Sequence, residues 1–323
     1  MKMLLKNYIF NIYRHIMMER CDNDGTMFYF SAEDFPGLSV EEYPFPSSAG
    51  HLLQGYIYSY SQSLPNRLVV FEHGMGDGHL PYMKEIETLC RNGFRVFAYD
   101  HTGCMRSGGD STNGFAQSLC DLNDCITTIK NDHRFQGTDI SVVGHSWGGY
   151  SAMNITELHP DISHVVSLCG YVSIRILLES HLEKYLKRYV NDLLDYERKL
   201  NPTFADYNAA VSLSRSHAKT LLIYSDNDKK CKPIHYEFLK QNLTKNDNIR
   251  LMIVHNKDHN PTYTPQAICN FKAYTKKRRR RKRLGLLKTT GQKASFVSSF
   301  DWNSITEQDA SVWREIISHL RDG

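Results

Sequence analysis

The sequence predicts an α/β protein built on an open, mostly parallel β-sheet flanked by helices. Short apolar runs alternate along the chain with longer segments of helical periodicity. Most of these runs lack the apolar–polar alternation of a strand with one exposed face, which is typical of strands buried on both sides. Right-handed crossovers between parallel strands place helices on both faces of such a sheet. With 323 residues, 41% of them hydrophobic, the chain can bury a large core.

The strands and helices of this core are predicted from their periodicity. An alternating segment at residues 52–60 is expected to pair with residues 40–45. The buried strands that follow are predicted at residues 68–71, 95–99, 140–143, 165–168, 221–224 and 251–254. The intervening helices are predicted at residues 82–91, 117–130, 147–158 and 233–242, with a last helix at 307–320.

The first 35 residues are predicted to form an N-terminal helical extension. Their apolar residues resemble those of a signal peptide, but Lys6 and Arg14 interrupt them and no small-residue cleavage site follows. An amphipathic helix is the better interpretation. No window of 18 apolar residues predicts a membrane span, and the eight cysteines include no C-x-x-C pair. These features are typical of a reduced, cytoplasmic protein.

One connection is too long for a simple crossover and predicts an insertion. It joins the strand at 165–168 to the strand at 221–224, and its middle part is helical and rich in charge. We expect a helical cap at residues 171–215, inserted between two parts of the core at 36–170 and 216–323. Ligands of open α/β sheets bind at the carboxyl ends of the strands, so an insertion there is expected to cover the site.

A run of eight basic residues, KKRRRRKR, occupies positions 276–283. The whole chain has a net charge of +4, so the remainder carries 4 − 8 = −4 and is not a general nucleic-acid-binding surface. The first interpretation is a flexible basic loop at residues 275–295. The second is attraction of Lys276–Arg283 to an anionic membrane surface, at about 1 kcal/mol per basic residue. No aromatic residues interleave the run, so no nucleic acid partner is expected.

A Gly-x-Ser-x-Gly motif supplies the candidate nucleophile. Gly144, Ser146 and Gly148 directly follow the predicted strand at 140–143 and open the helix that begins at Trp147. This strand–turn–helix setting is that of a nucleophile elbow, a strained turn that projects the serine hydroxyl above the sheet. Glycines are expected on either side because a Cβ there would collide with the neighbouring strand and helix.

A serine hydroxyl needs a base within hydrogen-bond reach and an acid that orients the base. Asp226 and Asp228 follow the strand at 221–224, and His255 and His259 follow the strand at 251–254. Both segments lie downstream of the serine, as the chain order of this arrangement requires. The spacing of the two histidines also occurs in zinc sites, but the segment is loop-like and no metal ligand set is predicted.

With these motifs the chain resembles the α/β-hydrolase-fold serine hydrolases, most closely the branch of bacterial esterases, lysophospholipases and serine aminopeptidases. The resemblance covers residues 40–270 and the last helix. In that family the acid closes a G-x-x-D pattern, which residues 225–228 match with serine for glycine, and the histidine is followed closely by proline, as in residues 258–261. The resemblance therefore implies Asp228 as the acid and His259 as the base.

The resemblance also implies an oxyanion hole. The family has a His-Gly-x-Gly segment after its third strand, which residues 73–76 match. It implies that the backbone N–H groups of Met75 and Trp147 stabilise the oxyanion. The supporting residues around the site are expected to be His73, Gly74, Gly76, Gly144, His145 and Gly148. A further family pattern, D-x-x-G-x-G-x-S, occurs at residues 100–107 with Met105 in place of the second glycine.

Together these features predict a serine hydrolase that cleaves carboxylic esters of a small-molecule acyl substrate through an acyl-enzyme on Ser146. No metal or organic cofactor is expected. A peptidase or thioesterase with the same three residues is the nearest alternative, because the motif does not separate esters, amides and thioesters. The alternative from another class is a non-catalytic member of the fold that binds a ligand.

Overall fold

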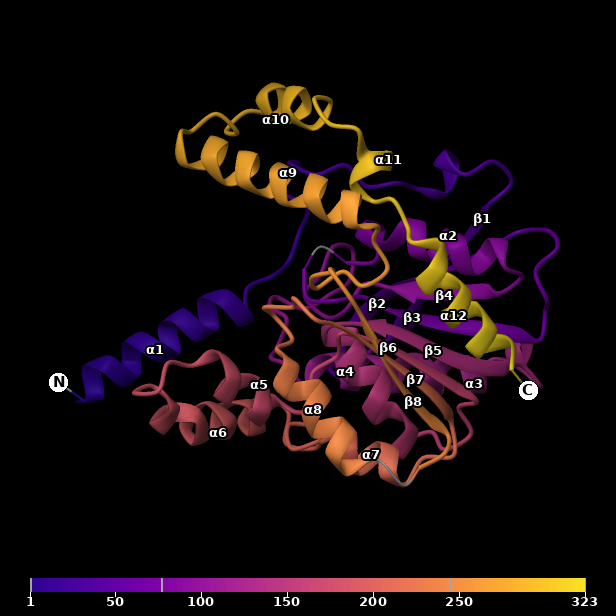
Figure 1. Ribbon diagram of the computed structural model, residues 1–323, viewed down its shortest axis with the longest axis horizontal. Coiled ribbons are helices and arrows are strands. Elements are labelled where there is room, and N and C mark those ends of the chain that lie inside the picture. The colour runs from indigo at the N-terminus through magenta and orange to yellow at the C-terminus, as the bar shows by residue number, and fades with distance from the viewer. Residues whose placement is uncertain (1, 77, 244–245, 323) are drawn as a thin grey trace.

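The computed structural model describes residues 2–76, 78–243 and 246–322 (Figure 1). These residues form an eight-stranded sheet in the order β1-β2-β4-β3-β5-β6-β7-β8, in which β2 alone runs against the other strands. The mostly parallel sheet predicted from the sequence is confirmed. The strands are β1 (Ser39–Pro46), β2 (Leu52–Ser59), β3 (Arg67–Glu72), β4 (Arg95–Tyr99), β5 (Asp139–His145), β6 (His164–Leu168), β7 (Lys219–Ser225) and β8 (Ile249–Val254).

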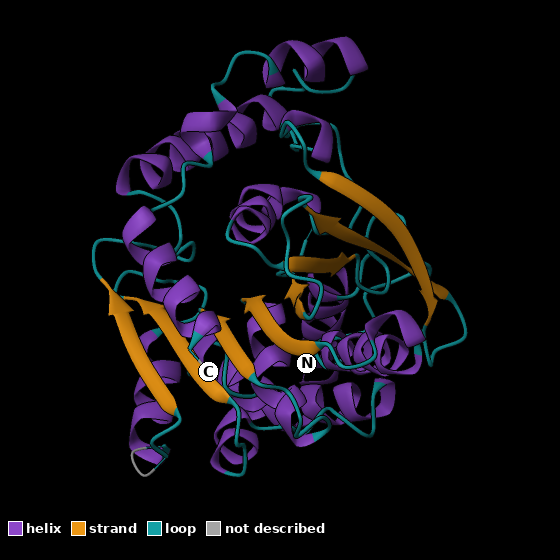
Figure 2. Cartoon of the chain, turned by 90° about the vertical axis from the view of Figure 1, so that its right-hand side faces the viewer, coloured by secondary structure: helices purple, strands orange, loops and turns teal. Residues whose placement is uncertain are grey.

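Helices cover both faces of the sheet, as Figure 2 shows. The side chains of β3 alternate between two cores: Leu68 and Val70 pack on one face, Val69 and Phe71 on the other. This explains why the strand is a continuous apolar run. One core includes side chains of α3 (Gln117–Asn131), α4 (Trp147–Asn154), α7 (Ala209–Ser214) and α8 (Pro233–Asn242). The other includes side chains of α2 (Met83–Arg91) and α12 (Ala310–Arg321).

The insertion, residues 171–215, leaves the carboxyl end of β6. It contains α5 (Ile174–His181) and α6 (Val190–Leu200) as well as α7. The N-terminal helix α1 (Lys2–Met17) lies beside α5 and α6 in Figure 1. The buried carboxylate of Glu197 in α6 connects the insertion to α1 and to the core. It accepts hydrogen bonds from the Tyr13 hydroxyl of α1 and, at 2.9 Å, from the backbone N–H of Phe115 in the core.

The remaining helices among the described residues are short or lie near the C-terminus. Short 3-10 helices lie at Ala32–Asp34, Leu80–Tyr82, His133–Phe135, Ile155–Glu157 and Lys187–Tyr189. Within the region predicted as an N-terminal extension, the helical residues are therefore those of α1 and one 3-10 turn. No helix in the described part of the chain is both long and apolar enough to span a membrane.

The prediction of a flexible loop at residues 275–295 is wrong. The segment is helical, with α9 (Pro265–Arg283), α10 (Thr290–Val297) and α11 (Trp302–Ile305) forming an arm between β8 and α12 (Figure 1). Thr264 caps α9 by accepting the N–H of Ala267 at 3.1 Å, and Pro265 occupies the first turn. The arm has a small core of its own, comprising Tyr274, Leu287, Phe296, Trp302 and Ile305.

Charge pairing also explains why the basic run is helical. Arg278 and Lys282 lie one turn apart on α9, and both pair with Asp24, Arg278 at 2.8 Å. Asp24 belongs to the extended segment that follows α1, so its contribution is not visible from the local sequence. A buried aromatic core and a carboxylate from a distant segment thus outweigh the mutual repulsion of the basic side chains.

Candidate active site

Ser146 occupies a strained turn between β5 and α4. Its backbone angles are φ 57° and ψ −109°, a region that few residues other than glycine adopt. Two glycines make this turn sterically feasible. A Cβ at Gly144 would lie closer than 3.0 Å to the carbonyl oxygen of Gly148, and a Cβ at Gly148 equally close to the carbonyl oxygen of Glu72. The backbones of β3, β5 and α4 therefore meet in van der Waals contact at this point.

Asp228 and His259 lie together at the carboxyl ends of β7 and β8. Nδ1 of His259 lies 2.7 Å from Oδ2 of Asp228, and both side chains are buried. The other carboxylate oxygen accepts the N–H groups of Lys230 at 2.7 Å and Cys231 at 3.0 Å. Burial alone would raise the pKa of Asp228, but these hydrogen bonds and the His259 imidazole outweigh it and hold the pKa below its usual value. The carboxylate is therefore ionised at neutral pH.

Asp226 and His255 form a separate pair. Nδ1 of His255 lies 3.2 Å from Oδ2 of Asp226, and the His255 side chain is 76% exposed. The structure thus brings Asp228 to His259 and directs Asp226 away from it. Neither member of the exposed pair is among the described residues that line the cavity beside Ser146.

Ser146 and His259 open into one cavity of about 920 Å³. No hydrogen bond joins the side chains of these two described residues. In free enzymes the hydrogen bond between a nucleophile and its base is often long, and it shortens when substrate binds. A large apolar part of the cavity wall comes from α1 and the insertion. Its side chains include Ile9, Ile12, Met17, Leu177, Leu178, Leu182, Leu186 and Leu193. Among the described residues that line the cavity, the Lys and Arg side chains are Lys230 and Arg278, and there is no Asp or Glu.

Met75 and Trp147 line the same cavity as Ser146. Met75 belongs to the loop that follows β3, the oxyanion loop (residues 73–76). Trp147 is the first residue of α4, where backbone N–H groups have no partner within the helix and the helix dipole favours negative charge. Both residues whose backbone N–H groups were named from the sequence therefore belong to the wall of the cavity that Ser146 lines.

A chain of hydrogen bonds ties the oxyanion loop to the two histidine-bearing segments. The N–H of Gly74 donates to the Tyr82 hydroxyl at 3.0 Å, which lies 2.8 Å from Nδ1 of His145. Nε2 of His145 lies 2.6 Å from the carbonyl oxygen of His259. Because that carbonyl only accepts, Nε2 of His145 carries the proton and Nδ1 accepts from Tyr82.

The ring of His145 is neutral, as the hydrogen bonds from Tyr82 and to the carbonyl of His259 require. Burial, together with the nearby His259 and Lys230, lowers the pKa of His145 to about 3. Sequence analysis named His145 as a supporting residue but missed Tyr82, which lies 63 positions away and carries no local motif. The only feature of the sequence that pointed to Tyr82 was its position at the start of the helix that follows the His-Gly-x-Gly segment.

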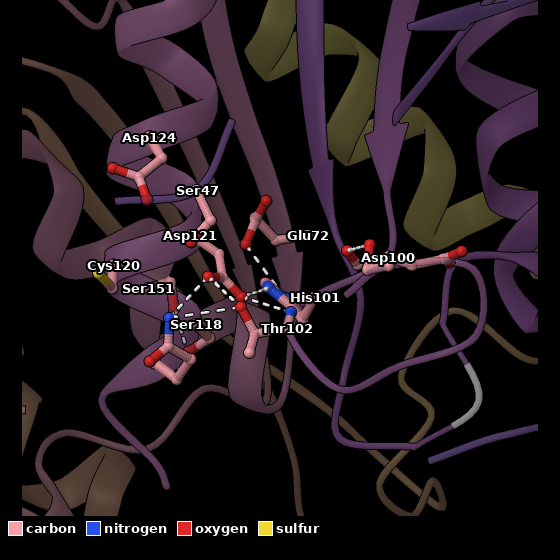
Figure 3. Close-up of polar contacts among 12 residues, drawn as sticks. Ser47, Glu72, Asp100, His101, Thr102, Ser118, Cys120, Asp121, Asp124 and Ser151 are labelled. Atoms are coloured by element: carbon pink, nitrogen blue, oxygen red, sulfur yellow. Dashed lines mark hydrogen bonds and ion pairs between the residues drawn. The ribbon is translucent and has the colours of Figure 1, made fainter. Parts of the chain in front are cut away.

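A second polar cluster lies beneath the oxyanion loop and is fully buried (Figure 3). His101, the second residue after β4, lies between two carboxylates: its Nε2 is 3.4 Å from Glu72 and its Nδ1 is 3.4 Å from Asp121. Burial raises the pKa of Glu72 to about 7, against the opposing effect of His101. Burial alone would lower the pKa of His101, but the two carboxylates outweigh it and raise that pKa.

This cluster supports the oxyanion loop through His73. The backbone N–H of His101 donates to Nε2 of His73 at 3.0 Å, and Nδ1 of His73 lies 2.6 Å from the carbonyl oxygen of Gly74. Sequence analysis named His73 but missed Glu72, His101 and Asp121. The sequence did contain one signal: Glu72 directly follows the apolar run at residues 68–71. A charged residue is rarely buried in such a position unless its charge is paired.

Met105, which stands where the family pattern has glycine, adopts a backbone conformation that glycine takes more readily than other residues. Its φ is 46°, in the left-handed region. The guanidinium of Arg20 accounts for the stability of this loop, since it donates to the carbonyl oxygens of Ser107 at 3.0 Å and Gly109 at 2.7 Å, and also to that of Met105.

Cys169 is the one further potential ligand group near the candidate acid and base in the described part of the chain. Its sulfur and the ligand atoms of Asp228 and His259 all lie within 4.8 Å of one another. Burial raises the pKa of the Cys169 thiol well above its usual value, because the thiolate would be desolvated. A metal site needs the thiolate and would compete with the hydrogen bond between Asp228 and His259, so the donor set fits a metal poorly.

The sheet order, the turn at Ser146 and the acid and histidine at neighbouring strand ends define the α/β-hydrolase class. Residues 63–226, about half of the chain, match the family model described as "Serine aminopeptidase, S33", and the chain belongs to that family. Its fold is therefore the α/β-hydrolase fold.

Solved structures and a curated relative agree with this assignment. An esterase of Pyrococcus furiosus is 17% identical, with a TM-score of 0.59 over 84% of this chain and 97% of that chain. An acetyl xylan esterase from Paenibacillus sp. R4 is 18% identical, with a TM-score of 0.55 over 72% of this chain and 82% of that chain. These likenesses show the fold.

A protein of Rhizobium rhizogenes, provisionally named as the carbamate hydrolase RutD, is 25% identical over 136 residues. The match covers 38% of this chain and 49% of that protein, so the chain spans about half the length of this relative.

Substituting Gly148 tests the close packing beneath Ser146. Gly148→Ala should lower the free energy of unfolding by about 3 kcal/mol, because its Cβ would displace the Glu72 carbonyl. Gly291→Ala is the matched control, since Gly291 also lies in a helix but has open space around its Cβ position. The control should be neutral or stabilise by up to about 1 kcal/mol. Urea unfolding measures both, and equal stability of the two variants would contradict the packing argument.

Proposed function

We propose that the protein is a serine hydrolase that cleaves carboxylic esters through an acyl-enzyme on Ser146. One observation carries the proposal. Ser146, in a strained turn, and His259, hydrogen-bonded to the buried Asp228, line a single cavity. A nucleophile, a base and an orienting acid at neighbouring strand ends are the parts that acyl transfer requires.

The chemistry follows from these positions. As Oγ of Ser146 attacks the ester carbonyl carbon, Nε2 of His259 takes the hydroxyl proton and Asp228 stabilises the imidazolium. The N–H groups of Met75 and Trp147 donate to the oxygen that becomes negatively charged. The tetrahedral intermediate then expels the alcohol, which leaves with the proton from His259. Water, deprotonated by His259, attacks the acyl-enzyme; the acid is released and Ser146 regains its proton.

The cavity favours an ester over the amide substrate of an aminopeptidase. An aminopeptidase must bind a free ammonium group, for which a carboxylate is the usual partner. Among the described residues that line the cavity there is no carboxylate, whereas Lys230 and Arg278 are present. Among these described residues an ammonium group would therefore meet like charge and no counter-charge. A neutral ester with an apolar acyl chain meets neither obstacle.

Exchanging each of the two candidate acids tests the catalytic assignment. Asp228→Asn should lower kcat/KM for a p-nitrophenyl ester by about a thousandfold or more, because the base loses the group that orients it and stabilises its protonated form. Asp226→Asn is the matched control. Its carboxylate pairs with the exposed His255, so the control should keep activity to within about twofold.

Steady-state kinetics of both purified variants, with Ser146→Ala as the inactive reference, decides between the two aspartates. A large loss in Asp226→Asn together with near-normal activity in Asp228→Asn would overturn the assignment. Circular dichroism of each variant confirms that it is folded.

The apolar wall predicts a preference for long acyl chains. Each methylene that moves from water into the cavity contributes about 0.8 kcal/mol, so kcat/KM should rise by up to about fourfold per buried methylene. Leu182→Trp would fill part of the cavity and should depress hydrolysis of long-chain esters while leaving acetyl ester hydrolysis unchanged. Leu64→Trp, at an exposed leucine outside the cavity, is the control. A chain-length series of p-nitrophenyl esters measures the effect, and an equal loss at every chain length would contradict it.

A further inference from the structure

The eight consecutive basic residues at the end of α9, residues 276–283, divide into two sets by their contacts. Four of them face the protein: Arg278 and Lys282 pair with Asp24, while Lys277 and Arg281 lie over the rings of Phe300 and Phe296 at 4.7 and 5.8 Å. The other four have no acidic partner among the described residues and are exposed to solvent. These are Lys276, Arg279, Arg280 and Arg283, here called the basic face of α9.

The basic face is a geometric unit. Its members follow one another at intervals of three, one and three residues, which places them on one side of a helix. The inward set fills the opposite side and holds the helix in place. Since the rest of the chain carries a net charge of 4 − 8 = −4, the positive field of the protein is concentrated here.

Two exposed leucines directly follow the basic face. Leu284 is 57% exposed and Leu286 is 43% exposed, in the turn that links α9 to α10. Large apolar side chains beside a patch of unpaired cations are the combination that binds the surface of an anionic bilayer, where cations meet headgroups and apolar groups insert between them. A nucleic acid would gain nothing from the leucines, and the face carries no aromatic side chain for base stacking.

The basic face and the two leucines are connected to the cavity through α9. Phe271 and Arg278 of α9 line the cavity, so the helix that carries the basic face is also part of the cavity wall. Figure 1 shows the C-terminal end of α9 on the same side of the molecule as α1 and the insertion. Two exposed aromatic side chains that line the cavity come from those segments: Tyr8 is 63% exposed and Tyr185 is 66% exposed.

We infer that the basic face of α9, together with Leu284 and Leu286, docks the protein on an anionic lipid bilayer with its cavity beside the membrane. An acyl substrate held in the bilayer would then lie next to the cavity. The inference goes beyond the proposed hydrolysis, and vesicle binding is measured without any turnover. Failure of docking therefore leaves the catalytic assignment untouched, and the reverse is also true.

Vesicle co-sedimentation of the full chain tests the inference. Binding is expected to vesicles of phosphatidylcholine with phosphatidylglycerol, but not to phosphatidylcholine alone, and it should weaken as added salt shortens the Debye length. The variant Arg279→Gln/Arg280→Gln/Arg283→Gln should bind about a hundredfold more weakly, at about fivefold per charge. The matched control removes three exposed basic residues from other helices, Lys199, Lys240 and Arg314, each replaced by Gln, and should bind as the wild type.

Fluorescence of a Leu284→Trp variant distinguishes a bilayer from other polyanions. Its emission, after subtraction of the wild-type spectrum, should shift to shorter wavelength with the anionic vesicles and not with double-stranded DNA. No binding to anionic vesicles, equal weakening in the matched control, or binding to DNA without a shift on vesicles would each overturn the inference.

Discussion

The contact between α4 and the end of β3 is the constraint on which the rest of the site depends. Gly148 lies against the carbonyl of Glu72, and Gly144 lies against Gly148, so three backbones meet where any side chain would separate them. This contact allows Ser146 to adopt its positive φ and places the N–H of Trp147 at the start of a helix. Because Glu72 also ends β3 and precedes the oxyanion loop, the same contact sets the position of Met75 relative to the nucleophile.

Two buried polar networks hold the loops around this contact. The Glu72–His101–Asp121 cluster supports the oxyanion loop through His73, and the Tyr82–His145 chain links that loop to the backbone of His259. Burying charge is costly unless the charges are paired, so these groups add little stability beyond what their burial costs. Their benefit is positional: each fixes a loop that contributes a backbone donor or the base. The neutral state of His145 is part of this arrangement, because only one ring nitrogen then carries a proton.

The parts of the molecule predictable from the sequence are those with a local cause. The strands follow from apolar runs, and the elbow follows from glycines within two residues of Ser146. Periodicity alone left Asp226 and Asp228 open, because both follow β7. The family resemblance implied Asp228, and the position of β8 brings His259 to that residue. Tyr82 and the carboxylate pair around His101 went unnoticed because their partners lie on other strands and helices. Residues 275–295 of the arm were predicted as a flexible loop because a stabilising partner, Asp24, lies more than 250 positions from Arg278 and Lys282.

Covalent labelling by a fluorophosphonate probe, with the adduct located by mass spectrometry, tests the central claim most directly. The probe reacts with a serine only when a base activates its hydroxyl, and it needs no knowledge of the natural substrate. The account predicts one adduct, on Ser146, whose formation is lost in a folded His259→Ala variant. An adduct on another residue, no adduct on the folded protein, or labelling of Ser146 at an unchanged rate without His259 would contradict it.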